Sequence, residues 1–340
     1  MTNLEDKEIK EQVYMEMLKN GKGESVIRKI DEINRRISRV VRKSSYVGSK
    51  GRYNDLMKEI KGIVNGIGKE IEKEYEIAEL ISYEIEKQVE ILEKELGVKI
   101  ETPKVNQIAS AVRFRPILKD MTFQSYLEKI ESGLYDIWDA QVRAGYISGI
   151  NTKQIVRNVL GEMDSLGKLK ESGMINSFRN SVYHNTLTAL QMIANESREQ
   201  VFRKNEKYFT GENGYKYEAL ATLDKKTCLV CGKLDKTLYK TYSECPKYPL
   251  HRRCRCLIIP YTKSLGLRAS MGGQYEDVSY SVWFSRQNSE LQKDILGNTR
   301  YKMYKSGKYD IQDFSSNSKV YTLSELRKKS AMPTIFDNIF

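Results

Sequence analysis

The stretch DKKTCLVCGKLDKTLYKTYSECPKYPLHRRCRCLIIP, from Asp224 to Pro260, holds all five cysteines of the chain and one of its two histidines. Within it, Cys228 and Cys231 are separated by two residues and are followed by Gly232. Two thiolates at this spacing can bind one ion from a single tight turn, and a glycine permits the positive φ that such a turn often needs. This part of the stretch therefore predicts one half of a metal site.

A second pair of metal-binding side chains returns about twenty residues further on, after a gap that suits a hairpin or a short loop. His251 and Cys254 are again separated by two residues. Together with Cys228 and Cys231 they supply four ligands, which close a tetrahedron around zinc and leave no position for a catalytic water. The spacing therefore predicts a structural Zn2+ site rather than a catalytic metal.

Two further thiols accompany these ligands. Side chains alternate along an extended segment, so Cys254 and Cys256 point to the same side and either can reach the ion. Whether His251 or Cys256 completes the site stays open at this stage, and Cys245 is a spare thiol. Clustering favours zinc over buried packing or redox thiols, and an odd count in a long chain argues against a disulfide framework.

The composition predicts a folded, largely helical protein. The 340 residues allow two or three modules, and they are 40% hydrophobic and 30% charged, with six prolines. The formal charge of +12 suggests an anionic partner such as nucleic acid, although lysine-rich helical surfaces are common. We find neither an apolar run long enough to span a membrane nor the layout of a signal peptide. We therefore expect synthesis in a reducing cytoplasm, which keeps thiols free for a metal.

Residues 1–105 are predicted to form an N-terminal helical arm or bundle. Residues 5–45 contain two helical patterns that we expect to be broken at Gly21-Lys22-Gly23. The second pattern has an apolar seam at heptad spacing, formed by Val26, Ile30, Ile33, Ile37 and Val40. Its other faces are basic, with Arg28, Lys29, Arg35, Arg36, Arg39, Arg42 and Lys43. Such a face indicates either contact with nucleic acid or solvation, and the pattern alone favours solvation.

A second apolar pattern runs from Tyr53 to Leu96, weakened where Gly62, Gly66 and Gly68 fall but free of glycine from Glu70 onward. It predicts a helical hairpin or small bundle, and Pro103 marks a domain boundary.

Residues 106–262 are predicted to form a core. Thr122 caps a helix from Phe123 to about Ala144, Asn151 opens a short helix, and a long helix runs from Met174 to Lys204. His184 lies in this helix and is expected to be a packed or surface residue. Three short strands are predicted within residues 215–222, 234–239 and 256–261. We expect zinc to hold this small β-unit, which is too thin to be stabilised by apolar burial alone.

Residues 263–340 are predicted to be a linker and a C-terminal helical tail. The fold class that follows is α+β, predominantly α-helical, with long N-terminal helices and a zinc-stapled β-unit in a helical core.

The cysteine stretch resembles the motif of phage head morphogenesis proteins, the minor capsid proteins similar to the F protein of phage Mu. The resemblance lies in Asp224, Thr227, Cys228, Cys231, Leu234-Asp235, Pro249-Leu250-His251 and Cys254-Arg255-Cys256. Trp283-Phe284, Gln287 and Ile295-Leu296-Gly297 are also similar to the end of many such proteins. The resemblance covers about residues 110 to 330, and the first hundred residues do not match the family.

The resemblance implies a structural protein that is made in the host cytoplasm, joins the head near the portal and stays inside it. There it would aid head assembly or DNA delivery. The implied partners are the portal protein, other head proteins and packaged DNA, bound without sequence preference, with no membrane and no small-molecule substrate. Arg252, Arg253 and Arg255 are candidates for contact with DNA or portal, or they only solvate the loop.

An enzyme is the first alternative function. A nuclease of the HNH type needs several histidines around one metal, but only His184 and His251 exist. The sequence offers no nucleophile with a matched base and no glycine-rich phosphate loop. We therefore expect no catalytic and no cofactor-binding residues besides the metal ligands. The second alternative is a zinc-ribbon regulator that binds DNA, which rarely needs two helical regions of this size.

Overall fold

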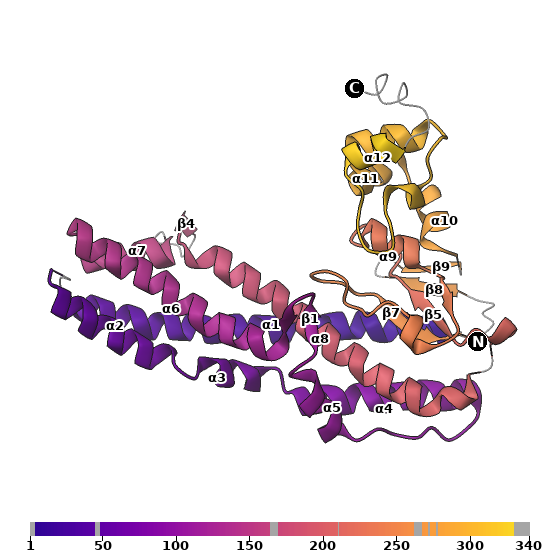
Figure 1. Cartoon of the computed structure of the whole chain (residues 1–340), viewed down its shortest axis with the longest axis horizontal. Helices are drawn as coiled ribbons and strands as arrows, with labels where there is room; N and C mark the ends of the chain where they lie inside the picture. Colours follow the sequence, from indigo (N-terminus) through magenta and orange to yellow (C-terminus); the bar gives the residue numbers. More distant parts are fainter. Residues whose placement is uncertain are drawn as a thin grey trace. The chain divides into compact units, whose positions relative to one another are not determined.

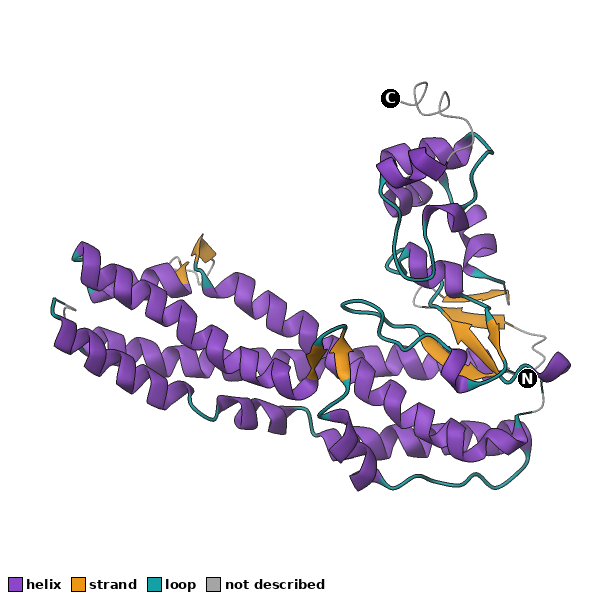
Figure 2. Ribbon diagram, in the orientation of Figure 1, coloured by secondary structure: helices purple, strands orange, loops and turns teal. Residues whose placement is uncertain are grey.

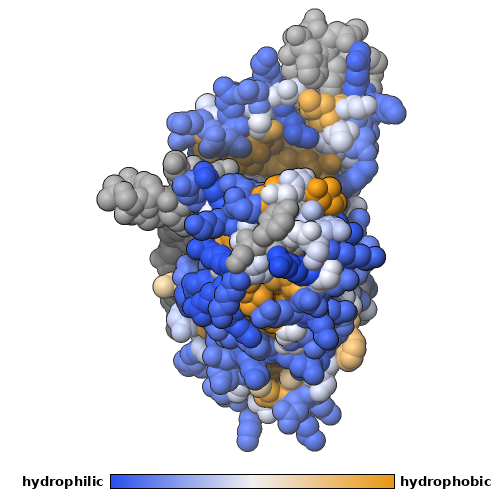
Figure 3. Space-filling view, turned by 90° about the vertical axis from the view of Figure 1, so that its left-hand side faces the viewer, coloured by the Kyte–Doolittle hydropathy of each residue, from blue (hydrophilic) through white to orange (hydrophobic). Residues whose placement is uncertain are grey.

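The computed structural model describes residues 4–44, 48–163, 169–209, 211–261, 267–270, 273–276 and 278–329. These residues form a predominantly helical protein with small antiparallel sheets, which confirms the predicted α+β class (Figures 1 and 2). None of the described helices combines the length and the apolar character that crossing a bilayer requires. Hydrophilic residues cover most of the face turned toward the viewer in Figure 3.

The chain divides into two compact units. Unit 1 comprises Met1–Glu16, Tyr83–Lys104 and Ala194–Phe340, and unit 2 comprises Met17–Ser82 and Val105–Ile193. One division, between Lys104 and Val105, agrees with the predicted boundary at residue 105, but none falls at residue 262, and each unit combines segments that are distant in the sequence. The reason is that the long helices α1 (Leu4–Lys43), α4 (Ile77–Leu96) and α8 (Ile175–Asn205) each contribute residues to both units.

The first helix, α1, is continuous, so the predicted break at Gly21-Lys22-Gly23 is wrong. A Cβ atom on Gly23 would lie 2.7 Å from Cε2 of Tyr183, so this glycine allows two helices to approach closely. The predicted seam is otherwise confirmed: Val26, Ile30, Ile33 and Ile37 are buried, and the last buried residue is Val41 instead of Val40.

The second pattern, predicted to form a helical hairpin or a small bundle, forms three helices. Helix α2 (Lys50–Val64) is separated from α3 (Ile67–Glu74) at Gly66, whose φ is 82°. A further interruption between α3 and α4 has Glu76 at φ 46°, within a stretch of strong helix formers. The preceding Tyr75 is buried, and its hydroxyl donates to Oγ1 of Thr186 at 3.0 Å. Tertiary contacts therefore outweigh helix propensity here.

The predicted core helices are confirmed, two of them within unit 2 and the third as α8, which both units share. Thr122 caps α6 (Phe123–Ser148) and Asn151 caps α7 (Thr152–Leu160), with side chains that accept from the backbone NH groups of Ser125 and Gln154. Trp138 on α6 is fully buried and donates from Nε1 to Oδ1 of Asn34 at 2.9 Å. The other elements here are α5 (Val105–Val112), the hairpin β1 (Pro116–Leu118) and β2 (Met121–Thr122), and the hairpin β3 (Gly161–Met163) and β4 (Leu169–Ser172).

Unit 1 contains the predicted β-unit. Strands β5 (Tyr217–Leu220), β6 (Leu238–Tyr239) and β7 (Leu257–Pro260) form an antiparallel sheet in the order β6-β5-β7. All residues of β5 and β7 are buried, and Ile9 of α1 packs with Leu220, Leu257 and Ile259. A second hairpin, β8 (Leu267–Ser270) and β9 (Gly273–Glu276), lies where a loop was expected. The rest of that linker, and residues 330–340, lie outside the described residues.

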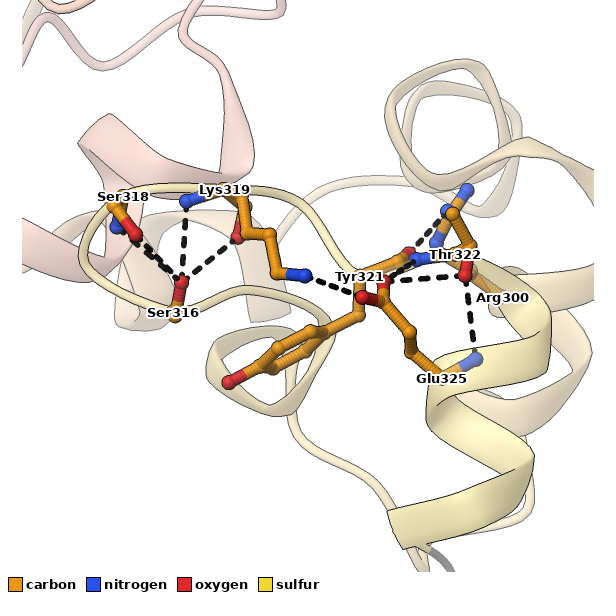
Figure 4. A network of polar contacts seen from close by, with 7 residues as sticks. All are labelled: Arg300, Ser316, Ser318, Lys319, Tyr321, Thr322 and Glu325. Atoms are coloured by element: carbon orange, nitrogen blue, oxygen red, sulfur yellow. Dashed lines mark hydrogen bonds and ion pairs between the residues drawn. The ribbon is translucent and has the colours of Figure 1, made fainter.

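The C-terminal segment packs against the cysteine turn and is not a separate tail. It comprises α10 (Tyr280–Ser285), α11 (Ser289–Lys305), a short 3-10 helix (Ile311–Phe314) and α12 (Leu323–Lys329). Its aromatic residues share a core with Leu229, which opens α9 (Leu229–Leu234). Figure 4 shows the polar network before α12, in which Glu325 accepts from the backbone NH of Thr322 at 2.8 Å and Arg300 donates to the carbonyl of Tyr321.

Candidate metal centre

The first two cysteines lie at the start of helix α9. Cys228 is the N-cap residue, with an extended backbone, and its Sγ accepts from the NH of Cys231 at 3.4 Å. Gly232 was predicted to supply a positive φ in a tight turn. This prediction is wrong, because Gly232 lies inside α9 and has no positive φ. A Cβ atom there would lie 2.3 Å from Cδ1 of Tyr280. Gly232 is therefore required for the close approach of this ring.

Three of the distances between donor atoms are close to those around a tetrahedral ion. His251 Nε2 lies 3.1 Å from the Sγ of Cys228 and 3.3 Å from the Sγ of Cys231. The sulfurs of Cys231 and Cys254 are 3.8 Å apart. Ligands held about 2.0 to 2.3 Å from zinc at tetrahedral angles are separated by about 3.5 to 3.8 Å. The two distances from His251 are somewhat shorter than these values and the sulfur–sulfur distance equals the upper one, so these three donors need only small shifts to hold an ion.

All five predicted ligands belong to this cluster. They form two groups that share Cys231, one with Cys228 and His251 and one with Cys254 and Cys256, and the donor atoms of each group lie within 4.8 Å of one another. Each thiol except that of Cys228 is buried. The spare thiol, Cys245, belongs to neither group, and its Sγ lies 3.6 Å from the carbonyl oxygen of Thr241. The arrangement could hold a metal ion.

The histidine is oriented by the loop that carries it. Nδ1 of His251 lies 2.9 Å from the carbonyl oxygen of Arg252, an acceptor that fixes the proton on Nδ1. In the neutral imidazole, the lone pair of Nε2 faces the sulfurs of Cys228 and Cys231. The loop itself turns at Arg253, whose φ is 61°, and the NH of Cys254 donates to the carbonyl of His251 at 3.1 Å.

The neighbouring side chains of the cluster shift the pKa values of Cys228 and His251 in opposite directions. A hydrogen bond from Cys231, followed by the contact with His251, lowers the pKa of Cys228 to about 5 against the opposing effect of burial. The hydrogen bond with Cys228 raises the pKa of His251 to about 11. A thiolate beside an imidazolium is the result. A soft divalent cation can take the place of the shared protons.

An ion pair supports the cluster from outside. Arg255 is buried and forms a bidentate pair with Asp224, which also accepts from the backbone NH groups of Lys226 and Thr227 at 2.8 and 3.1 Å. Arg255 was grouped with its neighbours as a contact for DNA or portal, and its burial removes it from that set. Arg252 and Arg253 are exposed.

A second support joins the cluster to the C-terminal segment. Asp235 is buried, and its carboxylate accepts from the backbone NH of Ala221 at 2.7 Å and of Tyr280 at 2.8 Å. The hydroxyl of Tyr280 donates to the carbonyl of Thr227 at 3.2 Å. Sequence reasoning missed Tyr280. The signal that could have found it is Ser279, a helix-capping residue directly before an apolar and aromatic run.

Outside the metal centre, the described residues contain no group of side chains arranged as an active site. A groove of about 1010 Å³ in unit 2 is lined mainly by polar residues. Two of its charged residues, Arg113 and Glu72, pair with each other at 2.5 Å, and Glu131 accepts from the NH of Gly66 at 3.1 Å. His184 is half-buried on α8, as expected for a packed or surface residue.

Comparisons of the chain with protein-family models, with curated proteins and with solved structures give no match. Its function is therefore inferred from the geometry of the metal centre and from the resemblance of the cysteine motif.

Proposed function

We propose that this chain is a structural minor capsid protein of a tailed phage or prophage head, and that its Cys/His cluster binds one structural zinc ion. In this role it lies inside the head near the portal and aids head assembly or DNA delivery, without turning over a substrate. Its partners are the portal protein, other head proteins and packaged DNA.

The thiolate-rich donor set supports zinc as the metal. Sulfur and imidazole ligands favour zinc over magnesium or calcium, which prefer oxygen. We assign Cys228, Cys231, His251 and Cys254 as the four ligands, because Nε2 of His251 faces two sulfurs and its Nδ1 is already engaged. Cys256 is then a neighbouring thiol that does not bind the ion.

The sheet is small, and the ion would stabilise it. Strands β5, β6 and β7 have four, two and four residues, and long connections separate them. An ion shared by Cys228 and Cys254 joins the turn after β5 to the loop before β7. Since the unfolded chain holds no preformed site, the free energy of zinc binding stabilises the folded β-unit.

The main support for the proposal is the position of the residues that resemble the phage head motif. Every polar member of the motif that resembles phage head proteins lies in or around the cluster, and Asp224, Asp235 and Arg255 each bind a group of the same unit. A closed tetrahedron has no open position for water, and these charged side chains are engaged by groups of the same unit. Such a motif suits a structural staple and not an active site.

Mass spectrometry of gradient-purified, nuclease-treated phage particles induced from the source strain tests the proposal. We expect peptides of this chain in full heads, at low stoichiometry relative to the major capsid protein. Their absence from both full heads and procapsids, with good coverage of the other head proteins, would contradict the proposal. DNA-binding and DNA-cleavage assays would then separate a zinc-ribbon regulator from a nuclease.

A further inference from the structure

One end of unit 2 is strongly basic. Residues 35–52 contain seven basic and no acidic residues, so they contribute +7 to a formal net charge of +12. The seven residues, all exposed, are Arg35, Arg36, Arg39, Arg42, Lys43, Lys50 and Arg52. We call them the basic end. More than half of the formal net charge is therefore concentrated in one short stretch.

Hydrogen bonds bring the two helices of this stretch to the same end of the unit. Asn34 of α1 accepts from Trp138 of α6 at 2.9 Å, and Tyr53 of α2 donates to Asp139 of α6 at 2.5 Å. Asn34 and Tyr53 thus lie at one level along α6. The part of α1 after Asn34 and the part of α2 before Tyr53 both extend beyond this level (Figure 1, left).

The basic end keeps its charge. The nearest acidic residues on α1 are engaged by other cations, since Asp31 pairs with Arg179 at 2.8 Å and Glu32 pairs with Lys29 at 3.3 Å. Among the described residues, no ion pair within 4.0 Å involves any of the seven basic side chains, while Arg35 and Arg36 lie near enough to acidic residues, Asp31 and Glu70, to attract their carboxylates. A solvated helix face usually carries interspersed charges of both signs, which this stretch lacks.

Helices α1 and α2 offer no apolar surface at the basic end for a lipid bilayer or a protein partner, and the exposed Ile147 of the neighbouring α6 is a single apolar side chain beside it. Ile37 and Val41 of α1 and Leu56 of α2 are buried, so neither helix offers an apolar face. Binding to a lipid surface needs apolar side chains that enter the bilayer, and protein interfaces have an apolar or aromatic centre. A polyphosphate needs only cations at its surface.

Duplex nucleic acid fits this surface better than a single strand. Proteins that bind single strands stack bases on aromatic rings, but here the rings of Tyr53 and Tyr146 stack on each other at 5.8 Å. Arg35, Arg39 and Arg42 share one face of α1 over about 10 Å, enough to follow several phosphates of one strand. We propose that the basic end binds duplex DNA through its phosphates, without reading the sequence.

This inference places the DNA contact on α1 and α2 instead of on Arg252 and Arg253. It does not depend on the presence of the chain in a virion, so it can succeed or fail separately from the proposed function.

Fluorescence anisotropy of the full-length protein with a labelled duplex of about 30 base pairs, over about 50 to 300 mM salt, tests it. We expect the logarithm of the binding constant to fall with the logarithm of salt with a slope of about −5. Replacing Arg39 and Arg42 by glutamine should reduce the slope by about 2 and weaken binding at least about tenfold. The pair Lys50→Gln and Arg52→Gln, on the other helix, should act in the same way.

The matched control is Lys293→Gln with Lys328→Gln, which removes the same charge from exposed positions of unit 1. It should leave the slope unchanged, and circular dichroism should show that all variants are folded. Failure of the wild-type protein to bind the duplex at low salt would overturn the proposal. So would equal losses in the control, unchanged binding in both basic-end variants, or tighter binding to duplex RNA or to vesicles rich in anionic lipid.

Discussion

The guanidinium of Arg255 donates to both carboxylate oxygens of Asp224, with distances of 2.5 Å from Nη1 and 2.7 Å from Nη2. Asp224 opens the turn that leads to Cys228, and Arg255 lies between Cys254 and Cys256. The side chains of the pair are only 9% and 15% exposed. This ion pair therefore joins the two halves of the metal cluster from outside, independently of any ion.

Removal of Arg255 should be costly, because it leaves the carboxylate of Asp224 largely buried without its counter-charge. We expect Arg255→Ala to lower the free energy of unfolding by about 3 kcal/mol in urea titrations of the native protein. Arg255→Lys keeps the charge but loses the bidentate geometry, so its loss should be smaller. Arg252→Ala, at an exposed neighbouring position, is the control and should change stability by less than about 0.5 kcal/mol. Equal stability of the two alanine variants would contradict the supporting role.

The ligand assignment predicts opposite results for variants of His251 and Cys256. His251→Ala should reduce the zinc content and weaken retention of zinc against a chelator, because it removes the imidazole that faces two sulfurs. Cys256→Ser should keep the metal, as should Cys245→Ser, whose thiol lies outside the cluster. Zinc content measured after gel filtration checks all three. Loss of zinc from Cys256→Ser with retention in His251→Ala would reverse the assignment.

A pH effect is expected from a buried carboxyl group in unit 1. Glu8 is fully buried near Glu84 and Arg198, and burial raises its pKa from 4.5 to about 7, against the opposing effect of Arg198. The folded state therefore binds one proton more than the unfolded state between these two values. Stability should fall by about 3 kcal/mol as pH rises through this window and then stay constant.

The variant Glu8→Gln tests this effect, since the neutral amide cannot ionise. It should be more stable than the wild type by about 2 to 3 kcal/mol at pH 8 and nearly equal at pH 5, as measured by urea unfolding. Glu59→Gln, at an exposed position of α2, is the control. A wild-type to Glu8→Gln difference that does not change with pH would contradict the raised pKa.

Two glycines of α1 should respond in opposite ways to alanine. A Cβ atom on Gly21 meets nothing within 4 Å, so Gly21→Ala should raise stability by about 0.5 to 1 kcal/mol through helix propensity. A Cβ atom on Gly23 would lie 2.7 Å from Tyr183, whose hydroxyl donates to Asn20, so Gly23→Ala should cost about 1 to 3 kcal/mol. Thermal unfolding of the two variants checks the pair. A gain in stability for Gly23→Ala would show that the helices do not pack so closely.

Much of the helical fold could be predicted because it depends on local patterns. The apolar seam of α1 and the caps Thr122 and Asn151 were readable from spacing and residue type. The role of Gly23 inside a continuous α1 was not, because the ring that leaves no room for a Cβ atom there belongs to Tyr183, far along the chain. The interruption after Tyr75 has a similar origin, because the partner of its hydroxyl lies on α8.

The metal ligands could be predicted, but their supports could not. Cysteine and histidine spacing indicates chelation directly, and all five candidates lie in one cluster. No local pattern indicates that Arg255 turns inward to Asp224 or that Tyr280 packs on Gly232. Both contacts join positions far apart in the chain, so only the fold brings them together.

The most direct test of the account is the zinc content of native protein, purified without chelators and measured by inductively coupled plasma mass spectrometry. We predict about one zinc ion per chain, and its loss in the Cys228→Ser, Cys231→Ser double variant together with loss of amide protection in β5 and β7. Native protein that contains no zinc, or a double variant that keeps both its zinc and its protected sheet, would contradict the structural zinc centre.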